Sequence, residues 1–249
     1  MRPLLVTLAA VAALAAPAAA GTPSRRPVPI LMYHVVANPP RAAPNPSLYV
    51  SRREFAAQMR WLAARGYRAV KLKQVYDAWR GRAALPSRPI VVSFDDGYRS
   101  QYTNALPVLR SHGWRGVLNL EVADTTESWG ARPWMVRAMI KGGWEVDAHT
   151  LTHPDLTTLD AAELRRQVAG SRGVIRRRYH VPVDFFCYPA GRYNARVVAA
   201  VRAAGYLGAT TVDFGLARPS ELYTLKRVRV FRGEGVGGLQ SALAGLGLG

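Results

Sequence analysis

The sequence predicts an α/β domain built around a mainly parallel β-sheet. Between Pro27 and Val230, short apolar runs rich in β-favouring residues alternate with longer runs of helical character. One junction recurs, in which a glycine that can end a helix in the left-handed conformation is followed by an aromatic residue that starts a strand. It occurs at Gly66-Tyr67, Gly113-Trp114, Gly143-Trp144 and Gly205-Tyr206. This alternation predicts a ligand site at the carboxyl ends of the strands.

Eight segments are predicted to be strands from their apolar, β-branched and aromatic content. They are Val28–His34, Tyr67–Leu72, Ile90–Phe94, Gly116–Val122, Trp144–His149, Asp184–Tyr188, Leu207–Thr211 and Leu225–Phe231. Helices are expected in most of the gaps, and three of them have recognisable starts. Ser51 with Glu54 has the spacing of a capping box. Asp160 with Glu163 opens a second helix, and Asn194 caps a third.

The two ends of the chain are expected to lie outside this pattern. Residues 1–20 have the form of a secretory signal peptide, with the apolar run Leu4–Ala16 and the small-residue cleavage site Ala18–Ala20. The run is short for a membrane span, so an uncleaved anchor is the weaker alternative, and no span is expected in the mature chain. We expect one mature domain over residues 21–249, secreted or located in the periplasm or cell envelope. The stretch Gly233–Gly249 is expected to be a frayed, glycine-rich tail.

The chain of 249 residues carries a formal net charge of +18. A protein that binds nucleic acid would concentrate such charge on one face, but the arginines are dispersed, and the tightest cluster is Arg176-Arg177-Arg178. Nucleic acid is therefore not an expected partner, whereas attraction to anionic envelope polymers remains open. Cys187 is the only cysteine, so no disulfide within the chain can form and stability must come from packing.

Two adjacent carboxylates follow the predicted strand that ends at Phe94. For an isolated Asp-Asp-Gly sequence, a solvated turn is the ordinary explanation. Here the preceding residues form a buried-strand pattern, which places Asp95 and Asp96 at the rim of the sheet. Successive side chains in an extended segment diverge, so one carboxylate can bind a metal ion while its neighbour handles a proton.

His149 and His153 form a second polar pair, at the end of another predicted strand. The alternative is a pair of structural polar residues, because two histidines four residues apart indicate metal only moderately. Pro154 disfavours a helix here, so we expect a loop that clamps an ion. Two neutral imidazoles and one carboxylate leave a divalent ion an open position for water, and a second carboxylate can take the proton of that water. The two motifs together predict a hydrolytic metal site.

Two further segments end strands on the same rim. His34 closes the strand that begins at Val28. We expect it to act beside the metal, as a positioning group or a general acid, and a hydrogen-bonded core histidine is the alternative. The segment Cys187–Asn194 contains the turn-forming residues Pro189 and Gly191. Its backbone amides are expected to face a developing oxyanion, with a simple turn between strand and helix as the alternative.

These motifs resemble those of the polysaccharide deacetylases with a NodB homology domain, carbohydrate esterase family 4. The similar segments are Ser93–Gly97, His149–His153 and Phe186–Gly191. The resemblance covers nearly the whole mature chain. The opening Leu31–His34 and the Tyr-Pro-x-Gly form of the third motif are similar to the branch that includes biofilm poly-N-acetylglucosamine deacetylases.

The resemblance implies a distorted (β/α) barrel, with seven rather than eight parallel strands as the expected number. It also implies an enzyme that removes acetyl groups from an N-acetylated polysaccharide or oligosaccharide. By the same resemblance, Asp95 is the catalytic base. One divalent ion, expected to be Zn²⁺, is held by Asp96, His149 and His153. Two alternatives remain open, an esterase acting on O-acetyl groups such as those of acetylated xylan, and a noncatalytic protein that binds envelope glycans.

The sequence departs from the family at two positions. Cys187 stands where the third motif often has an arginine that orients the base. The segment Leu225–Arg227 has no imidazole, although many members keep a histidine there that protonates the leaving amine. Since His34 is the only remaining histidine predicted on the rim, we expect the first strand to supply this proton donor.

Five residues are expected to line the groove that binds the sugar. They are Tyr33, Trp134, Tyr188, Pro189 and Ala190. An amide near Ala190 is expected to steady the oxyanion. For the aromatic residues, a place in the apolar core is the alternative.

Overall fold

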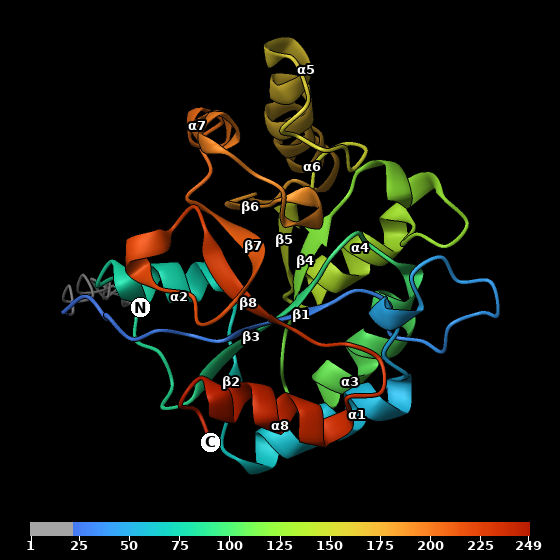
Figure 1. Ribbon diagram of the computed structural model, residues 1–249, viewed down its shortest axis with the longest axis vertical. Helices are drawn as coiled ribbons and strands as arrows, with labels where there is room; N and C mark the ends of the chain where they lie inside the picture. Colours follow the sequence, from blue (N-terminus) through green and yellow to red (C-terminus); the bar gives the residue numbers. More distant parts are fainter. Residues whose placement is uncertain (1–21) are drawn as a thin grey trace, which may run out of the picture.

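The computed structural model describes residues 22–249. The expected signal peptide, residues 1–20, lies outside the described residues. Seven parallel strands close into a barrel in the order β1-β8-β7-β6-β5-β4-β3 and back to β1 (Figure 1). They are β1 (Ile30–Tyr33), β3 (Pro89–Phe94), β4 (Val117–Leu120), β5 (Glu145–Ala148), β6 (Phe185–Cys187), β7 (Gly208–Phe214) and β8 (Leu225–Arg229). The short β2 (Arg68–Ala69) pairs with the start of β3. The predicted seven-stranded (β/α) barrel is therefore confirmed.

Each of the eight predicted strand segments contains a strand, and four of the turns that lead into strands depend on glycine as predicted. Positive φ angles of 79°, 70°, 87° and 82° occur at Gly66, Gly113, Gly143 and Gly205. A residue with a Cβ atom is strained in this left-handed region, whereas glycine is not. The glycine therefore lets each helix end abruptly, and the aromatic residue after it enters the core.

Eight α-helices surround the barrel in the described part of the chain (Figure 1). They are α1 (Arg52–Ala64), α2 (Leu72–Trp79), α3 (Leu106–Ser111), α4 (Pro133–Lys141), α5 (Ala161–Arg165), α6 (Ser171–Tyr179), α7 (Ala195–Ala203) and α8 (Gly235–Gly245). Short 3-10 helices cover Pro46–Leu48, Ala123–Thr126, Pro189–Gly191 and Pro219–Glu221, and π-helical segments cover Gln101–Ala105 and Arg166–Gly170. The three predicted caps are present, because the side chains of Ser51, Asp160 and Asn194 accept hydrogen bonds from amides of the first turn. Within residues 22–249, no helix has the length and apolar character needed to cross a membrane.

The prediction of a frayed tail over residues 233–249 is wrong, because α8 forms there and packs on α1 (Figure 1). Leu239 and Leu243 lie four residues apart and are buried on one side of this helix. The carboxylate of Glu54 in α1 accepts a hydrogen bond of 2.7 Å from the amide of Gly235. Burying each leucine contributes roughly 1.5–3 kcal/mol, which offsets the roughly 1 kcal/mol that each glycine costs in a helix.

The alternation of side chains along β3 explains how the strand delivers a polar group to the rim. Val92 and Phe94 point into the large apolar core between the barrel and the helices. Val91 points the opposite way, into a second apolar cluster that α2 helps to cover. Ser93 shares the face of Val91 and donates a hydrogen bond of 2.7 Å to Leu31 O. The same face continues at the end of the strand, so the next inward position is Asp95.

Two acidic residues of β5 also point into the barrel. Asp147 is fully buried and accepts a hydrogen bond of 2.9 Å from Phe185 N. Burial raises the pKa of Asp147 to about 7. Burial, together with the negative charge of Asp147, raises the pKa of Glu145 well above its usual value. In the folded protein these carboxyl groups therefore keep protons at a pH where the unfolded chain has lost them.

We expect Asp147→Asn to change how stability depends on pH. The pKa of Asp147 is higher in the folded than in the unfolded protein, so the folded state binds more protons. The free energy of unfolding of the wild type should therefore fall as the pH rises from about 4 to about 7. The variant lacks this loss, so its free energy of unfolding relative to that of the wild type should rise by about 3 kcal/mol across that range. Urea unfolding at several pH values measures the difference, and parallel curves for the two proteins would contradict the interpretation.

Candidate active site and metal centre

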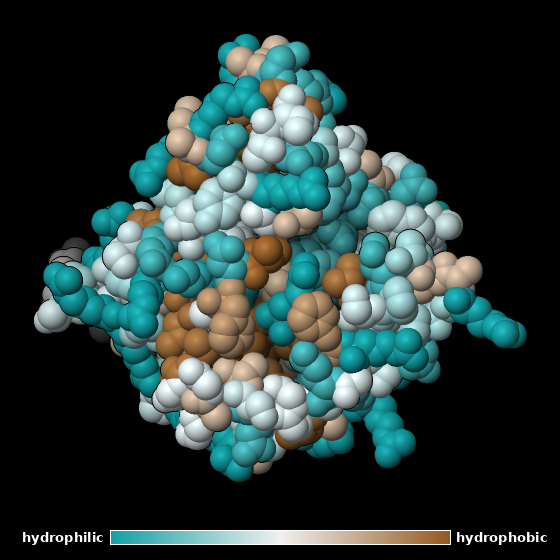
Figure 2. Space-filling view, viewed as in Figure 1, coloured by the Kyte–Doolittle hydropathy of each residue, from teal (hydrophilic) through white to brown (hydrophobic). Residues whose placement is uncertain are grey.

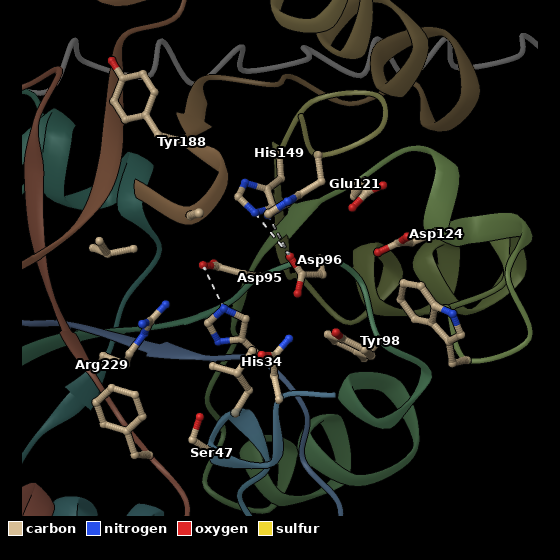
Figure 3. A pocket seen from close by; sticks show the side chains of 17 residues that line it. His34, Ser47, Asp95, Asp96, Tyr98, Glu121, Asp124, His149, Tyr188 and Arg229 are labelled. Atoms are coloured by element: carbon tan, nitrogen blue, oxygen red, sulfur yellow. Dashed lines mark ion pairs between the residues drawn. The ribbon is translucent and has the colours of Figure 1, made fainter. Parts of the chain in front are cut away.

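Side chains that follow three barrel strands meet in one cavity of about 590 Å³ (Figure 3). His34 follows β1 and His149 follows β5, while Asp95 and Asp96 follow β3. The other residues that line the cavity are Asn45, Ser47, Leu48, Tyr98, Glu121, Asp124, Trp129, His153, Tyr188, Ala190, Val212, Arg229 and Phe231. The middle of the face shown in Figure 2 is hollowed, and hydrophilic and hydrophobic surfaces meet around it. The two polar motifs that were expected to share a rim therefore lie together in one cavity.

Asp96, His149 and His153 bring three possible metal ligands together. Asp96 Oδ1 lies 3.3 Å from His149 Nε2 and 3.8 Å from His153 Nε2. One ligand atom from each residue lies within 4.8 Å of the other two. Asp96 Oδ1 is buried and has no hydrogen-bond partner in the protein. A buried carboxylate oxygen needs a positive or donating partner, so this group fits a cation.

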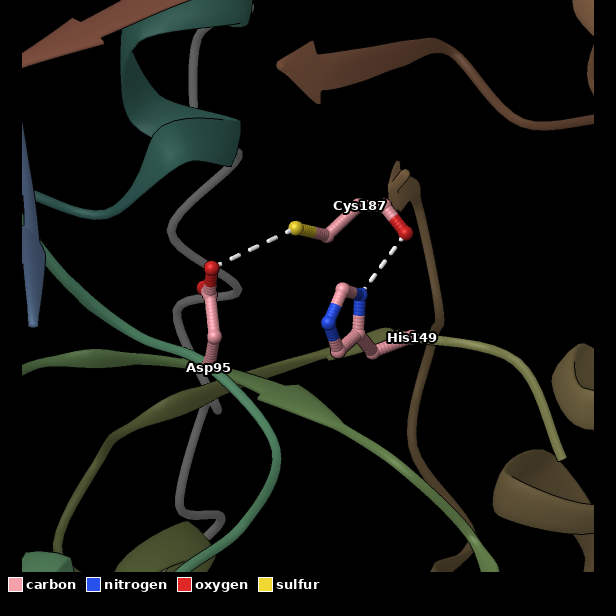
Figure 4. Close-up of side chains that lie close together, drawn as sticks. All are labelled: Asp95, His149 and Cys187. Atoms are coloured by element: carbon pink, nitrogen blue, oxygen red, sulfur yellow. Dashed lines mark hydrogen bonds between the residues drawn. The ribbon is translucent and has the colours of Figure 1, made fainter. Parts of the chain in front are cut away.

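The backbone determines which nitrogen of His149 faces Asp96, because the other nitrogen, Nδ1, points to the carbonyl oxygen of Cys187 (Figure 4). His149 Nδ1 lies 2.8 Å from the carbonyl oxygen of Cys187. Because a carbonyl oxygen only accepts, Nδ1 carries the proton, and in the neutral ring Nε2 presents a lone pair toward Asp96. Two imidazole lone pairs and one carboxylate that face one another are typical of sites for divalent ions such as zinc.

A proton and a metal ion would compete for the position between Asp96, His149 and His153. Burial lowers the pKa of His149, but the neighbouring Cys187 and Asp96 outweigh burial and raise this pKa well above its usual value. The pKa of His153 is lowered, because burial and the neighbouring His149 both disfavour a second positive charge. The cluster therefore attracts one positive charge, and acid should weaken metal binding.

The loops that carry these side chains have strained backbones. Positive φ angles of 74°, 70°, 53° and 50° occur at Asp96, Thr150, His153 and Ala190. Each such residue costs about 1–3 kcal/mol, and the strain persists only where the surroundings hold it. Thr150 contributes to this, since its Oγ1 accepts a hydrogen bond of 2.9 Å from His153 N. The segment His149–His153 contains no helix, as its sequence predicted.

The other carboxylate, Asp95, is held by a buried arginine that the sequence analysis did not identify. Arg227 Nη1 and Nη2 each donate a hydrogen bond of 2.8 Å, one to each oxygen of Asp95. Asn119 Nδ2 donates a third, of 2.7 Å. Burial by itself raises the pKa of Asp95, but Arg227 outweighs burial and holds this pKa well below its usual range. Asp95 is therefore an ionised carboxylate with a fixed orientation.

Arg227 is itself fully buried and bonded on every side. Its Nε donates a hydrogen bond of 2.7 Å to Thr211 O, and its Nη2 lies 3.3 Å from Cys187 Sγ. A guanidinium from β8 therefore holds Asp95 in this chain, where the third motif of the family often has an arginine at the position of Cys187. The sequence carried a weak signal for it, because Arg227 shares a strand face with the apolar Leu225.

His34 lies beside Asp95 in the cavity. Its Nε2 is 3.8 Å from Asp95 Oδ2, and its side chain is 9% exposed. Burial lowers the pKa of His34, and the charge of Asp95 counteracts part of this effect. Gln101 Nε2 donates hydrogen bonds to the carbonyl oxygens of His34 and Asp95, at 2.9 Å and 2.6 Å. One side chain therefore ties the ends of β1 and β3 together.

Of the five residues expected to line a sugar groove, the structure brings two to the cavity. Tyr188 and Ala190 line it, and the buried Pro189 between them does not. Tyr33 is fully buried in the core outside the barrel. Tyr33 directly precedes His34, and successive side chains of a strand point to opposite faces, so Tyr33 points away from the cavity. The expectation that Tyr33 lines the sugar groove is therefore wrong.

Trp134 also lies away from the cavity. It is 57% exposed on α4, and its ring packs edge-on against that of Tyr102. The tryptophan that lines the cavity is Trp129, whose ring lies 4.9 Å from that of Tyr98, measured between centroids. Neither tryptophan belongs to a strand end, so the rule that located the polar residues could not distinguish them.

Three charged residues that the sequence analysis did not consider also line the cavity. They are Glu121, Asp124 and Arg229. Glu121 directly follows β4, so the strand-end rule that located Asp95 also applies to it. Burial and the charge of Asp96 raise the pKa of Glu121 to about 7, and burial and the charge of Glu121 raise that of Asp124 to about 8. Arg229 lies across the cavity from these two carboxylates (Figure 3).

Comparisons with known proteins point to one family. A family model described as polysaccharide deacetylase matches residues 82–209. YxkH of Bacillus subtilis, whose name places it among the polysaccharide deacetylases, is 28% identical over 207 residues, which cover 83% of this chain and 72% of YxkH. The poly-β-1,6-N-acetyl-D-glucosamine N-deacetylase of Escherichia coli K12 is 42% identical over 60 residues, which cover 24% of this chain and 9% of that protein.

A solved structure shares the fold described above. The Streptococcus pyogenes deacetylase PplD, in complex with acetate, superimposes with a TM-score of 0.82. The match covers 88% of this chain and 99% of PplD, at 22% sequence identity. At this identity the likeness concerns the arrangement of the barrel rather than the reaction.

We expect Arg227→Met to destabilise the fold strongly, because Asp95 would remain as a buried carboxylate without its cation. The free energy of unfolding should fall by about 3–5 kcal/mol, and adding Asp95→Asn should restore a large part of it. Urea unfolding of the single and double variants measures this coupling. The matched control is Arg192→Met, which breaks an exposed pair with Asp155 and should lower the free energy of unfolding far less. Losses that simply add in the double variant would argue against a coupled pair.

Proposed function

The chain belongs to the polysaccharide deacetylase family. We propose that it is a metal-dependent enzyme that removes acetyl groups from the N-acetylated sugars of a glycan. We also propose that it is secreted or located in the cell envelope. One observation carries the proposal. Three metal-binding side chains lie beside an ionised and firmly held carboxylate in the same cavity. A protein that only binds glycans has no need of such a base next to a group of metal-binding side chains.

We propose that Asp96, His149 and His153 hold one divalent ion, and that zinc suits this set of ligands best. The unpartnered Asp96 Oδ1 and the fixed tautomer of His149 support this assignment. When bound, the ion would polarise the acetyl carbonyl and make a water molecule more acidic.

Asp95 is the proposed general base. Its carboxylate is adjacent in sequence to the ligand Asp96, and Arg227 keeps it ionised, so it can accept the proton that the attacking water loses. The same pairing makes Asp95 a weak base, so the step depends on a water whose own pKa is lowered. We propose that the amide of Ala190, on the cavity wall, donates a hydrogen bond to the oxyanion.

His34 is the proposed donor of the proton that the departing amine requires. Apart from the two proposed ligands, it is the only histidine among the residues that line the cavity. Burial lowers the pKa of His34, so an imidazolium at this place is a stronger acid than one in water. Its position beside Asp95 puts the proton donor and the proton acceptor on the same side of the cavity.

The proposed substrate is a polymer or oligomer of N-acetylglucosamine. The name of the Escherichia coli relative specifies such a polymer for that protein. In this chain, Trp129 and Tyr188 offer apolar ring surfaces on which a sugar can pack. The net charge of +18 would also keep the enzyme close to anionic polymers of the envelope.

The mature protein, supplied with zinc, should release acetate from N-acetylglucosamine polymers or oligomers, and exhaustive chelation should abolish this release while largely sparing the fold. An acetate assay on peptidoglycan, chitooligosaccharides, poly-N-acetylglucosamine and acetylxylan tests this expectation. Release from acetylxylan alone would make the protein an O-acetyl esterase. Release that survives complete removal of metal would rule out the proposed metal role.

Two neighbouring variants serve as a matched pair in the same assay. Asp95→Asn should keep the bound ion and lose roughly a thousandfold in turnover, because the proton of the water then has no acceptor. Asp96→Asn should lose the ion itself. Metal analysis of both purified variants, beside their acetate release, distinguishes the two roles, and the reverse pattern would exchange them.

His34→Ala should retain the metal and lower the turnover of N-acetyl substrates by roughly a hundredfold, the scale of lost general-acid catalysis. An amine needs a proton to leave far more than an alcohol does, so the loss on an activated O-acetyl ester should be smaller. His180→Ala, at an exposed position outside the cavity, is the control and should match the wild type. Near wild-type rates of His34→Ala on both substrates would leave His34 with a structural role only.

A further inference from the structure

One side of the cavity carries two carboxylates that the proposed reaction does not use (Figure 3). Glu121 follows β4, and Asp124 lies in the short helix Ala123–Thr126 that comes next. The two residues line the cavity yet are only 9% and 4% exposed. Asp124 Oδ2 is buried and has no hydrogen-bond partner in the protein. Within residues 22–249, neither carboxylate forms an ion pair with an arginine, lysine or histidine.

A pair of this kind selects a positively charged ligand, because two neighbouring buried carboxyl groups without a cation are stabilised only by holding protons, which a bound cation can replace. A second metal ion fits less well than an organic cation. The described residues contain two groups of three metal-binding side chains, and neither group includes Glu121 or Asp124. An ammonium group has three N–H donors and can be satisfied by the oxygens of two carboxylates.

The neighbouring walls suit a sugar that carries such an ammonium group. Trp129 lies in the loop that follows Asp124, and its ring packs on that of Tyr98 with centroids 4.9 Å apart. This contact holds the indole in place, while Trp129 remains 43% exposed and open to a sugar ring. Arg229 lies on the opposite side of the cavity and repels a positive charge there (Figure 3). The cavity therefore has acidic side chains on one flank of the catalytic residues and a basic side chain on the other.

We propose that Glu121 and Asp124 form a subsite for the ammonium group of a glucosamine that has already lost its acetyl group, beside the N-acetylated sugar in the catalytic centre. The inference rests on the proposed function. Hydrolysis adds water across the amide, breaks the bond between carbon and nitrogen, and releases acetate, so each turnover leaves on the glycan an amine that is protonated near neutral pH. The enzyme recognises this product within the same glycan chain.

The subsite has a consequence for the pattern of the product. Because the ammonium group is attracted by the flank that holds Glu121 and Asp124 and repelled by the flank that holds Arg229, the deacetylated sugar occupies only one side of the reacting sugar. Each deacetylation then favours the next one at an adjacent sugar. Free amines accumulate in blocks, not at random positions along the glycan.

The test compares defined oligosaccharides on the zinc-loaded full-length protein. One is a fully acetylated oligomer of N-acetylglucosamine, and two others carry a single glucosamine on one or the other side of an N-acetylated sugar. For one of these two, the wild type should have a kcat/KM for acetate release about tenfold above that of the fully acetylated oligomer, the scale of a charge-assisted hydrogen bond. The double variant Glu121→Gln/Asp124→Asn keeps the shape of the side chains but removes their charge, and should bring this ratio close to one.

Glu127→Gln is the matched control. It removes one negative charge from the same segment, but Glu127 is exposed and does not line the cavity, so the preference should persist. A thermal unfolding curve checks that each variant is folded. The amides are expected to be tolerated, since they replace carboxylates that have no cation in the protein. Calorimetry with a glucosamine oligomer provides a second readout that needs no turnover, and the double variant should bind it at least about tenfold more weakly.

The possible outcomes separate this inference from the function on which it rests. A double variant with the same ratio as the wild type would overturn the subsite, and so would a wild type that prefers the fully acetylated oligomer over both others. No release of acetate from any of the three oligomers by the wild type would overturn the proposed function itself. A second bound zinc ion per chain that the double variant loses would show that the two carboxylates bind metal and not an ammonium group.

Discussion

The bidentate pair between Arg227 and Asp95 is the interaction on which the site depends. Arg227 belongs to β8 and Asp95 follows β3, and these strands lie on either side of β1. The same guanidinium also contacts Thr211 on β7 and Cys187 on β6. One side chain therefore links the strand ends that present the proposed base and position His149. Only a planar guanidinium has the five N–H donors in fixed geometry that these contacts require, so a lysine is no substitute.

This pairing also explains how two adjacent carboxylates come to differ. The oxygens of Asp95 are occupied by Arg227 and Asn119, which leaves that group ionised and immobile. Asp96, with a φ angle of 74°, turns the other way and faces two imidazoles. Burial raises the pKa of Asp96, but the neighbouring His149 and His34 outweigh burial and lower this pKa overall. Asp95 and Asp96 have the same side chain, so their different proposed roles follow from the different groups that contact them.

The order of elements and the position of the rim could be predicted from local patterns, because glycine turns and strand alternation depend on nearby residues. The strand-end rule alone located His34 and Asp95. The rule could not identify Arg227, which lies 132 positions from Asp95 in the sequence. The alternation of side chains predicts which residues share a face of a strand, but it does not predict which strands become neighbours when the barrel closes. Tyr33 is a different case, because the inward direction of His34 already implied that the residue before it faces outward. The C-terminal helix was missed because its composition disfavours a helix that tertiary packing nevertheless stabilises.

The closure of the barrel joins the first and the last strands of the sequence, since β1 pairs with β8. β8 is the last strand of the barrel to be synthesised, and contacts between residues so far apart in sequence form slowly. Asp95 is made early but gains its guanidinium only after position 227 has emerged. A growing or partly folded chain therefore lacks the guanidinium that holds the proposed base, and the proposed hydrolytic chemistry belongs only to the finished molecule.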